Sequence, residues 1–430
     1  MSINDESKFE FHISRRTVLG VSLFVVLLLS LVFIGTFMMG SRGVSLENAI
    51  HVKTENELRS TINNAFYRGS VVIALSNDIS LSRSSLTIPA NKDITLTSSK
   101  TIGCYKLIGA DGESTITVVE DGVLKIDGII VTHESGKEGS GVTVESGGTL
   151  IVYSGEISGN TVRGVGMPIL IGGYSREGGG VYNSGVFEMY GGKISGNLAS
   201  VGNGGGVYNT GTFKLSGGEI SNNNATTTTF TDSEICGYGG GVCNTGTFAM
   251  SSGKIVRNMA SGGGGVRNYG TFELSGGEIT YNTASGGGGV YSYNGVFTML
   301  GGTISGNNAY YRGGGVYVHW GSTFDRQDGM ISGNTITNEE GEGKDVYNNG
   351  SIGGSPGGNS GSGSGDNSSE QTNGNGDGLS MVEGFSLREV VILCIGVVGV
   401  TLAVVMAVLF FTSKKRIVVE EKRGRFIVEG

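Results

Sequence analysis

A cassette of about 24 residues repeats along this chain and limits its possible folds more than any other feature. One copy, GGGVYNTGTFKLSGGEISNN, occupies residues 204–223, and close variants begin at Gly178, Gly239 and Gly263. The step from Phe to Ile is seven residues in all six copies, whereas the step from Ile to the next Val varies between 11 and 22 residues. Alignment gives three apolar columns: Val181, Val207, Val242, Val266, Val290 and Val316; Phe187, Phe213, Phe248, Phe272, Phe297 and Phe324; Ile194, Ile220, Ile255, Ile279, Ile304 and Ile331.

The spacing of these columns predicts a parallel β-helix. Apolar and polar residues alternate within each copy, as in Phe213, Lys214 and Leu215, which is the period of a β-strand. A unit of three short strands cannot bury its own core, so the units must stack, with like residues above one another at about 4.8 Å. We therefore expect an all-β fold of about ten coils over residues 45–350, capped at its start by an amphipathic helix over Glu55–Phe66.

Polar columns support the same register. Asn recurs three residues after each Ile and two residues after several of the Val residues, which predicts hydrogen-bonded ladders at the turns. Paired glycines, such as Gly217 and Gly218, predict a bend with positive φ. The residue before the Ile column alternates in sign from coil to coil: Glu156, Lys193, Glu219, Lys254 and Glu278. Opposite charges then lie one coil apart, which favours this stacking over a slipped one.

Glycine makes up 80 of the 430 residues, which raises the question of whether the glycine runs hold a phosphate. None of them is followed by Lys-Ser/Thr at the start of a helix, as a P-loop requires, and they recur in every copy. The apolar content of 37% and the 3 Pro exclude a disordered chain and collagen. We expect the glycines to form turns, with no cofactor bound.

Charge and histidine content exclude two further kinds of site. The net charge of −8 argues against a nucleic-acid partner, which would need a basic surface. The four His are scattered along the chain, and the four Cys lack the spacing of a zinc site, so we expect no metal centre. Cys236 and Cys243 are close enough in sequence to pair across a loop.

Two uncharged apolar runs are each long enough to cross a bilayer. Basic residues precede the first run and follow the second, so the positive-inside rule predicts cell-membrane localisation, with the chain between the runs outside the cell. The predicted layout is a cytoplasmic N-terminus at 1–17, a transmembrane anchor or signal segment at 18–39, a β-helix ectodomain at 45–350, a Gly/Ser/Asn-rich flexible stalk at 351–386, a transmembrane helix at 390–411 and a cytoplasmic tail at 412–430.

The cassette, together with LTIPANKDITLTS and GVTVESGGTL upstream, resembles the right-handed β-helix repeats of adhesin-like surface proteins from methanogenic archaea and gut bacteria. These belong to the pectin-lyase-like superfamily. A weaker likeness links the repeats to chlamydial polymorphic outer-membrane proteins. The resemblance covers residues 50–350 and implies a right-handed helix. It leaves function open, because this fold hosts lyases, hydrolases and adhesins alike. A barrel-forming C-terminal segment and an LPxTG-type sorting motif are both absent from the sequence.

Aromatic residues give the candidate ligand site. Tyr often follows the Val of the column, and strand alternation predicts that it lies on the outer surface. Such tyrosines could stack on sugar rings or could form a ladder that stabilises the coils. The long corner loops Thr161–Gly178 and Asn224–Tyr238 are a second candidate for recognition. The residues predicted to bind ligand are Tyr291, Tyr310, Tyr311, Tyr317, His319 and Trp320.

Catalytic residues are not evident. Paired carboxylates of glycosidases lie about 5–9.5 Å apart, whereas Glu188 and Glu273 would be about 14 Å apart. Asp325 and Asp328 are neighbours in a predicted solvated loop. We expect a membrane-anchored, extracellular adhesin-like protein, and not an enzyme, that binds a carbohydrate, cell-surface or matrix partner. The alternatives are a polysaccharide lyase or hydrolase of the same fold and a ligand-free structural envelope protein.

Overall fold

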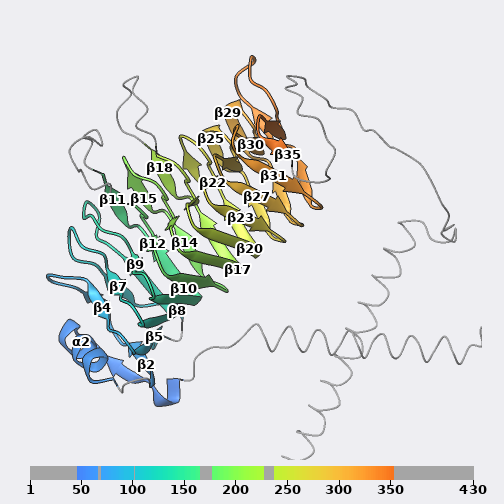
Figure 1. Ribbon diagram of the computed structural model, residues 1–430. Helices are drawn as coiled ribbons and strands as arrows, with labels where there is room; N and C mark the ends of the chain where they lie inside the picture. The colour runs from blue at the N-terminus through green and yellow to red at the C-terminus, as the bar shows by residue number, and fades with distance from the viewer. Residues whose placement is uncertain (1–45, 66–68, 101, 165–176, 227–236, 353–430) are drawn as a thin grey trace, which may run out of the picture. The chain divides into compact units, whose positions relative to one another are not determined.

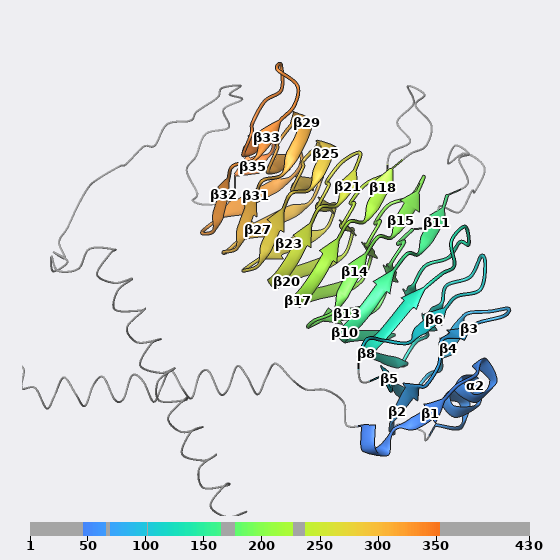
Figure 2. The same cartoon turned by 180° about the vertical axis from the view of Figure 1, so that it is seen from behind.

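The computed structural model of the protein describes residues 46–65, 69–100, 102–164, 177–226 and 237–352. These residues form a right-handed parallel β-helix of about ten coils, as the sequence predicts. Figures 1 and 2 show the coils stacked from the blue N-terminal end to the orange C-terminal end, with strands of successive coils side by side.

The membrane predictions fall on other parts of the chain. Among the described residues, no helix is long and apolar enough to cross a membrane. The apolar runs 18–39 and 390–411, the cytoplasmic segments and nearly all of the stalk at 351–386 lie outside the described residues. The first two stalk residues, Ser351–Ile352, form a strand that pairs with Thr323 and Phe324 and so belong to the last coil.

Three parallel sheets run along the helix. Sheet B contains the Val column and consists of β4 (Leu86–Ile88), β7 (Ile116–Val118), β9 (Val142–Val144), β12 (Val181–Asn183), β16 (Val207–Asn209), β19 (Val242–Asn244), β22 (Val266–Asn268), β26 (Val290–Ser292), β30 (Val316–Val318) and β34 (Val346–Asn348). Sheet C consists of β11 (Thr161–Arg163), β15 (Leu198–Ser200), β18 (Asn224–Thr226), β21 (Met259–Ala260), β25 (Thr283–Gly286), β29 (Asn308–Arg312) and β33 (Thr335–Ile336).

Sheet A contains the Phe and Ile columns and is the largest of the three. Its first strands are β1 (Ile50–Val52), β2 (Ser70–Leu75), β3 (Ile79–Ser80), β5 (Asp93–Ser98), β6 (Lys106–Ile108), β8 (Val123–Thr132) and β10 (Thr149–Ser158). The later strands are β13 (Val186–Met189), β14 (Lys193–Ser195), β17 (Thr212–Ser221), β20 (Thr247–Val256), β23 (Thr271–Leu274), β24 (Glu278–Thr280), β27 (Val296–Met299), β28 (Thr303–Ser305), β31 (Thr323–Arg326), β32 (Met330–Ser332) and β35 (Ser351–Ile352).

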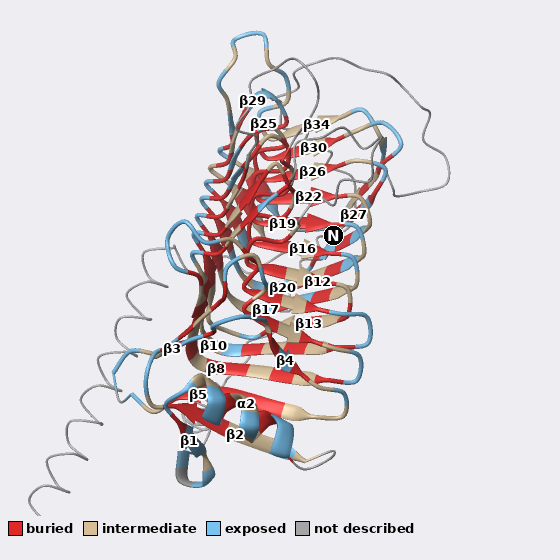
Figure 3. Ribbon diagram, turned by 90° about the vertical axis from the view of Figure 1, so that its left-hand side faces the viewer, coloured by how far each residue is buried: buried red, intermediate tan, exposed pale blue. Residues whose placement is uncertain are grey.

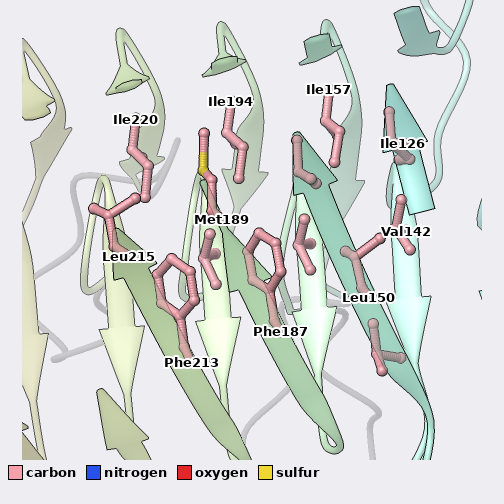
Figure 4. Packing of buried hydrophobic residues seen from close by; sticks show 14 of the residues in the cluster. Ile126, Val142, Leu150, Ile157, Phe187, Met189, Ile194, Phe213, Leu215 and Ile220 are labelled. Atoms are coloured by element: carbon pink, nitrogen blue, oxygen red, sulfur yellow. The ribbon is translucent and has the colours of Figure 1, made fainter. Parts of the chain in front are cut away.

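The three predicted apolar columns are confirmed by the strand register. Val207 pairs with Val242, Phe213 with Phe248 and Ile220 with Ile255, and the other coils follow the same pattern. The stacked Phe rings have centroids 4.5–4.9 Å apart and lie almost parallel. Figure 4 shows these side chains pointing into the interior, and Figure 3 shows the buried inner positions of each coil. The fixed seven-residue step therefore places both columns on the same interior surface.

A short helix covers the first coil, as predicted. An initial 3-10 turn (Leu46–Asn48) and β1 precede α2 (Glu55–Asn64), which ends two residues before the predicted boundary. The N-cap hydroxyl of Thr54 accepts the Glu57 amide, and Glu57 in turn accepts the Lys53 amide, so side chains satisfy two backbone donors at the start of the helix. Leu58 and Ile62 face the core and are fully buried.

The predicted Asn ladders exist, and they are buried. The amide nitrogen of Asn223 donates to Oδ1 of Asn258 at 3.0 Å, and Asn258 repeats this to Asn282. The same oxygen also accepts a backbone amide of the preceding coil. This ladder starts at His133, whose ring lies 2.8 Å from Oδ1 of Asn160, and ends at Asp345. Inside a protein, each of these amides would be costly without its partner, so the ladder fixes the stacking of the coils.

The prediction of three strands per coil was incomplete, because it missed sheet C. Its inward positions carry small residues in register: Ala199, Ala225, Ala260, Ala284 and Ala309. The glycine run packs against this sheet. A Cβ on Gly205 would lie 2.4 Å from the Asn224 carbonyl, and one on Gly206 would lie 2.6 Å from the Gly241 carbonyl. These two glycines are needed for close packing, whereas Gly204 and Gly218 have positive φ, as turn residues do.

Candidate functional site

The outer surface of sheet B carries a column of stacked side chains. Register places Tyr182 on Tyr208 and Tyr291 on Tyr317, and their ring centroids lie 5.6 Å and 4.3 Å apart. In full, this column reads Tyr182, Tyr208, Cys243, Arg267, Tyr291, Tyr317 and Tyr347. The column lies next to the sheet C side of the coil, because a Cβ on Gly286 would meet the Tyr317 ring at 3.2 Å. Its rings are therefore half-buried.

A second aromatic column lies beside the first. Tyr269, Tyr293 and His319 each follow a member of the first column by two residues, so they project from the same face of the sheet. The Tyr293 and His319 rings lie 4.5 Å apart, and His319 lies 5.5 Å from Trp320. We call the whole surface the aromatic face, made of Arg267 with Tyr238, Tyr269, Tyr291, Tyr293, Tyr317, His319, Trp320 and Tyr347.

Arg267 lies at the N-terminal end of this face, where four tyrosine rings surround it. Its guanidinium carbon is 3.6 Å from the ring centroid of Tyr291, and the rings of Tyr238, Tyr269 and Tyr293 lie within 5.0 Å of it. The residue is only 3% exposed. Its Nε and Nη1 atoms have no hydrogen-bond partner among the described residues, and no ion pair there involves it. The column projects outward from sheet B, as predicted, but neighbouring side chains cover Arg267 and Cys243, so these two positions are buried.

Burial sets the protonation of the face. It raises the pKa of the Tyr208, Tyr269 and Tyr317 phenols above their ordinary value, although Arg267 opposes this shift at Tyr269. Burial also raises the pKa of the Cys243 thiol, which is a free cysteine. Cys236, the predicted partner of Cys243, lies outside the described residues. At neutral pH the three phenols are therefore hydrogen-bond donors.

The structure brings together four of the six predicted ligand residues. Tyr291, Tyr317, His319 and Trp320 belong to the aromatic face, and Trp320 is the most accessible of them, with 68% of its surface exposed. Tyr310–Tyr311 instead form an edge-to-face pair on β29 of sheet C. No ring contact in the described part of the chain joins this pair to the aromatic face.

The sequence predictions missed Tyr238, Tyr269 and Tyr293 and gave Arg267 no role. A signal for two of them was present, because Tyr269 and Tyr293 lie two residues after the outward column and strand alternation repeats at that interval. Tyr238 precedes a glycine run, and its approach to Arg267 depends on how the corner folds back onto sheet B. The corner loops themselves lie largely outside the described residues.

Other polar features were considered as sites. A polar cavity of about 330 Å³ lies where sheet C begins, and its lining includes Glu113, Glu177 and Tyr182. Glu177 is already engaged there, because its carboxylate accepts the backbone and side-chain amides of Asn203. The predicted acidic pair is divided between two elements: Asp325 is a half-buried residue of β31 that accepts Gln327 at 2.9 Å, and Asp328 lies in the exposed bend that follows the strand. The prediction of a solvated loop therefore fails for Asp325. The described residues contain no group of three His, Cys, Asp or Glu that could hold a metal ion.

Comparisons with known proteins add no assignment. No family model, no curated protein and no solved structure matches the chain. The β-helix architecture therefore stands on the structure, and the resemblance to adhesin-like surface proteins stays a prediction.

Proposed function

We propose that this protein is a membrane-anchored, adhesin-like surface protein that binds carbohydrate through its aromatic face. The observation that carries the proposal is the gathering of two aromatic columns, with half-buried His319 and exposed Trp320, on one surface of a rigid solenoid. Aromatic rings offer apolar faces for the C–H groups of sugars, while phenol and indole groups offer hydrogen bonds. A stacked β-helix orders these rings before binding, which lowers the entropy lost on association.

The apolar runs 18–39 and 390–411 support a position at the cell membrane, with the solenoid outside. Protease added to intact cells that make the full chain should digest the solenoid and leave both terminal segments protected. Digestion of the terminal segments before the solenoid would contradict this orientation.

Carbohydrate binding is testable with the full-length chain purified in detergent and applied to a glycan array. We expect binding to at least one glycan, weakened about tenfold or more in the double variant His319→Ala/Trp320→Ala, because stacking residues carry most of the energy at such sites. Tyr190→Ala is the matched control, since Tyr190 is a half-exposed ring in the bend directly after β13, away from the aromatic face. Binding to no glycan would favour the ligand-free structural alternative. Release of shortened or unsaturated sugars would favour the enzyme alternative.

A further inference from the structure

Arg267 is a buried cation that forms no ion pair with the described residues. The exposed lysines of sheet A lie beside carboxylates of the neighbouring coil, as Lys254 does with Glu278 at 3.0 Å. Arg267 occupies an outward position of sheet B, and its neighbours one coil before and one coil after are Cys243 and Tyr291, which carry no negative charge at neutral pH. No carboxylate of the described residues pairs with it, although it is almost completely buried.

A buried cation without an anion is costly, and the four tyrosine rings compensate it only in part. Ring faces attract a guanidinium electrostatically, at about 0.5–2 kcal/mol for each good contact. They do not replace the acceptors that Nε and Nη1 would have in water, and an unpaired donor costs about 1–3 kcal/mol. An anion next to the rings would not reach these donors, but it would be attracted by the uncompensated charge through the low-dielectric surroundings. The site therefore carries a built-in preference for negative charge.

The surroundings of Arg267 allow its charge to attract an anion that lies on the aromatic face. The guanidinium lies beneath rings and not in water, so salt screens it less than it screens an exposed lysine. Neighbouring phenols are protonated and can donate to an anion. The whole chain carries a net charge of −8, so general attraction cannot draw an acidic ligand to it. Selection for acid must come from the local field of Arg267.

We propose that the aromatic face selects acidic carbohydrate, meaning a glycan that bears carboxylate or sulfate groups, and that Arg267 is the specificity-determining residue. The proposal rests on the proposed carbohydrate-binding function and adds the ligand class. The sugar ring stacks on His319, Trp320 and Tyr293, while an acidic group of the same or a neighbouring sugar lies over the tyrosines that enclose Arg267.

The test uses the full-length chain on an array that carries the same oligosaccharides in neutral, carboxylated and sulfated form. Three variants separate charge from folding. Arg267→Met removes the charge with a similar volume, Arg267→Lys keeps a positive charge, and Arg326→Met removes a cation from an exposed position on sheet A. Thermal unfolding of each variant shows that the solenoid is intact.

We expect wild-type protein to bind the acidic forms at least tenfold more tightly than the neutral form. Arg267→Met should bind the acidic and neutral forms with equal affinity, while Arg267→Lys retains part of the preference and Arg326→Met retains all of it. Equal binding of neutral and acidic forms by the wild type would overturn the inference and leave the proposed function intact. A preference that persists in folded Arg267→Met would also overturn it. Binding to no form would overturn the proposed function itself.

Discussion

Sheet A and sheet B are formed by the same coils, but their outer surfaces differ in composition: sheet A carries paired charges and sheet B carries stacked aromatic rings. On sheet A, charges of opposite sign pair between neighbouring coils: Lys193 with Glu219 at 3.1 Å, Lys214 with Glu188 at 3.0 Å and Lys254 with Glu278 at 3.0 Å. On sheet B, the equivalent positions carry tyrosines and Arg267, and no ion pair of the described residues lies in that column. Sheet A therefore pairs several of its outer charges between coils, whereas the outer column of sheet B holds stacked rings and a buried guanidinium that has no ion pair among the described residues.

This contrast separates scaffold from site within a repeat. Cassette residues that recur in every coil, such as the Phe and Ile columns and the buried Asn ladder, serve stacking. The aromatic face appears where the repeat departs from its consensus, as at Arg267 in place of Tyr and at Tyr269 in place of Thr245. Departures of this kind mark the surface on which selection for binding can act without loss of the coil.

The largest effect should come from the interior that both surfaces share. Asn258→Ala removes four hydrogen bonds of the buried ladder, so that Asn223 and Asn282 each lose a side-chain partner. We expect a loss of about 3 kcal/mol or more in the free energy of unfolding, measured by chemical denaturation. Asn63→Ala on the exposed side of α2 is the control and should change it by less than about 0.5 kcal/mol. Similar losses in the free energy of unfolding for both variants would show that the buried Asn ladder does not stabilise the stacked coils.

A smaller effect should distinguish the two kinds of glycine. Gly206→Ala brings a methyl group against the Gly241 carbonyl and Ile220, so we expect a loss of about 2–3 kcal/mol. Gly196→Ala meets no atom within 4 Å but must keep a φ of +63°, which costs about 1 kcal/mol. If Gly196→Ala were the more damaging in thermal unfolding, the role of Gly206 in close packing between coils would be wrong.

Alkaline pH should act on sheet B and spare sheet A. Burial raises the pKa of Cys243 and Tyr269 in the folded chain, while the unfolded chain titrates near about 8.5 and 10. The stabilising contribution is complete below these unfolded values. As pH rises through them, the unfolded chain releases protons that the folded chain keeps, so stability falls. We expect a loss of about 2 kcal/mol between about pH 8.5 and 10, and a shallower decline in Cys243→Ala. An unchanged decline in that variant would contradict this account.

The smallest effect belongs to the exposed charges of sheet A. Lys254→Glu places a carboxylate between Glu219 and Glu278, and we expect a loss of about 0.5–1 kcal/mol that shrinks in about 1 M salt. Lys254→Gln, which removes the attraction without adding repulsion, should cost less. Glycan binding should not change in either variant. A change in glycan binding would contradict the assignment of binding to sheet B alone.

The sequence was sufficient to predict the stacked coils. It was insufficient to predict sheet C and the full set of residues in the aromatic face. The Val, Phe and Ile columns were predictable because a constant seven-residue step and large side chains leave one stacking register. Alternating charges were predictable in position, although Glu219 pairs with Lys193 and not with Lys254. Sheet C was missed because Ala225 and its equivalents carry little hydrophobic signal.

The candidate site was predictable in part for a related reason. Exposed aromatics such as Trp320 are visible in a sequence, and strand alternation places them on one face. The burial of Arg267 depends on Tyr269 of its own coil, on Tyr291 and Tyr293 of the next coil and on Tyr238 from the preceding corner. The contacts between coils leave no local pattern in the sequence. The split between Tyr311 and Tyr317, six residues apart, likewise follows from the fold of that corner onto sheet C.

Trp320 offers the most direct measurement of the central claim, because it is the only tryptophan and lies exposed on the aromatic face. Its fluorescence should be followed while a glycan that binds the full-length protein is added, with the affinity measured independently by calorimetry. We predict a saturable change in Trp320 emission with the same dissociation constant as the calorimetric value. Tight binding that leaves the emission unchanged would show that the ligand occupies another surface and would contradict the account.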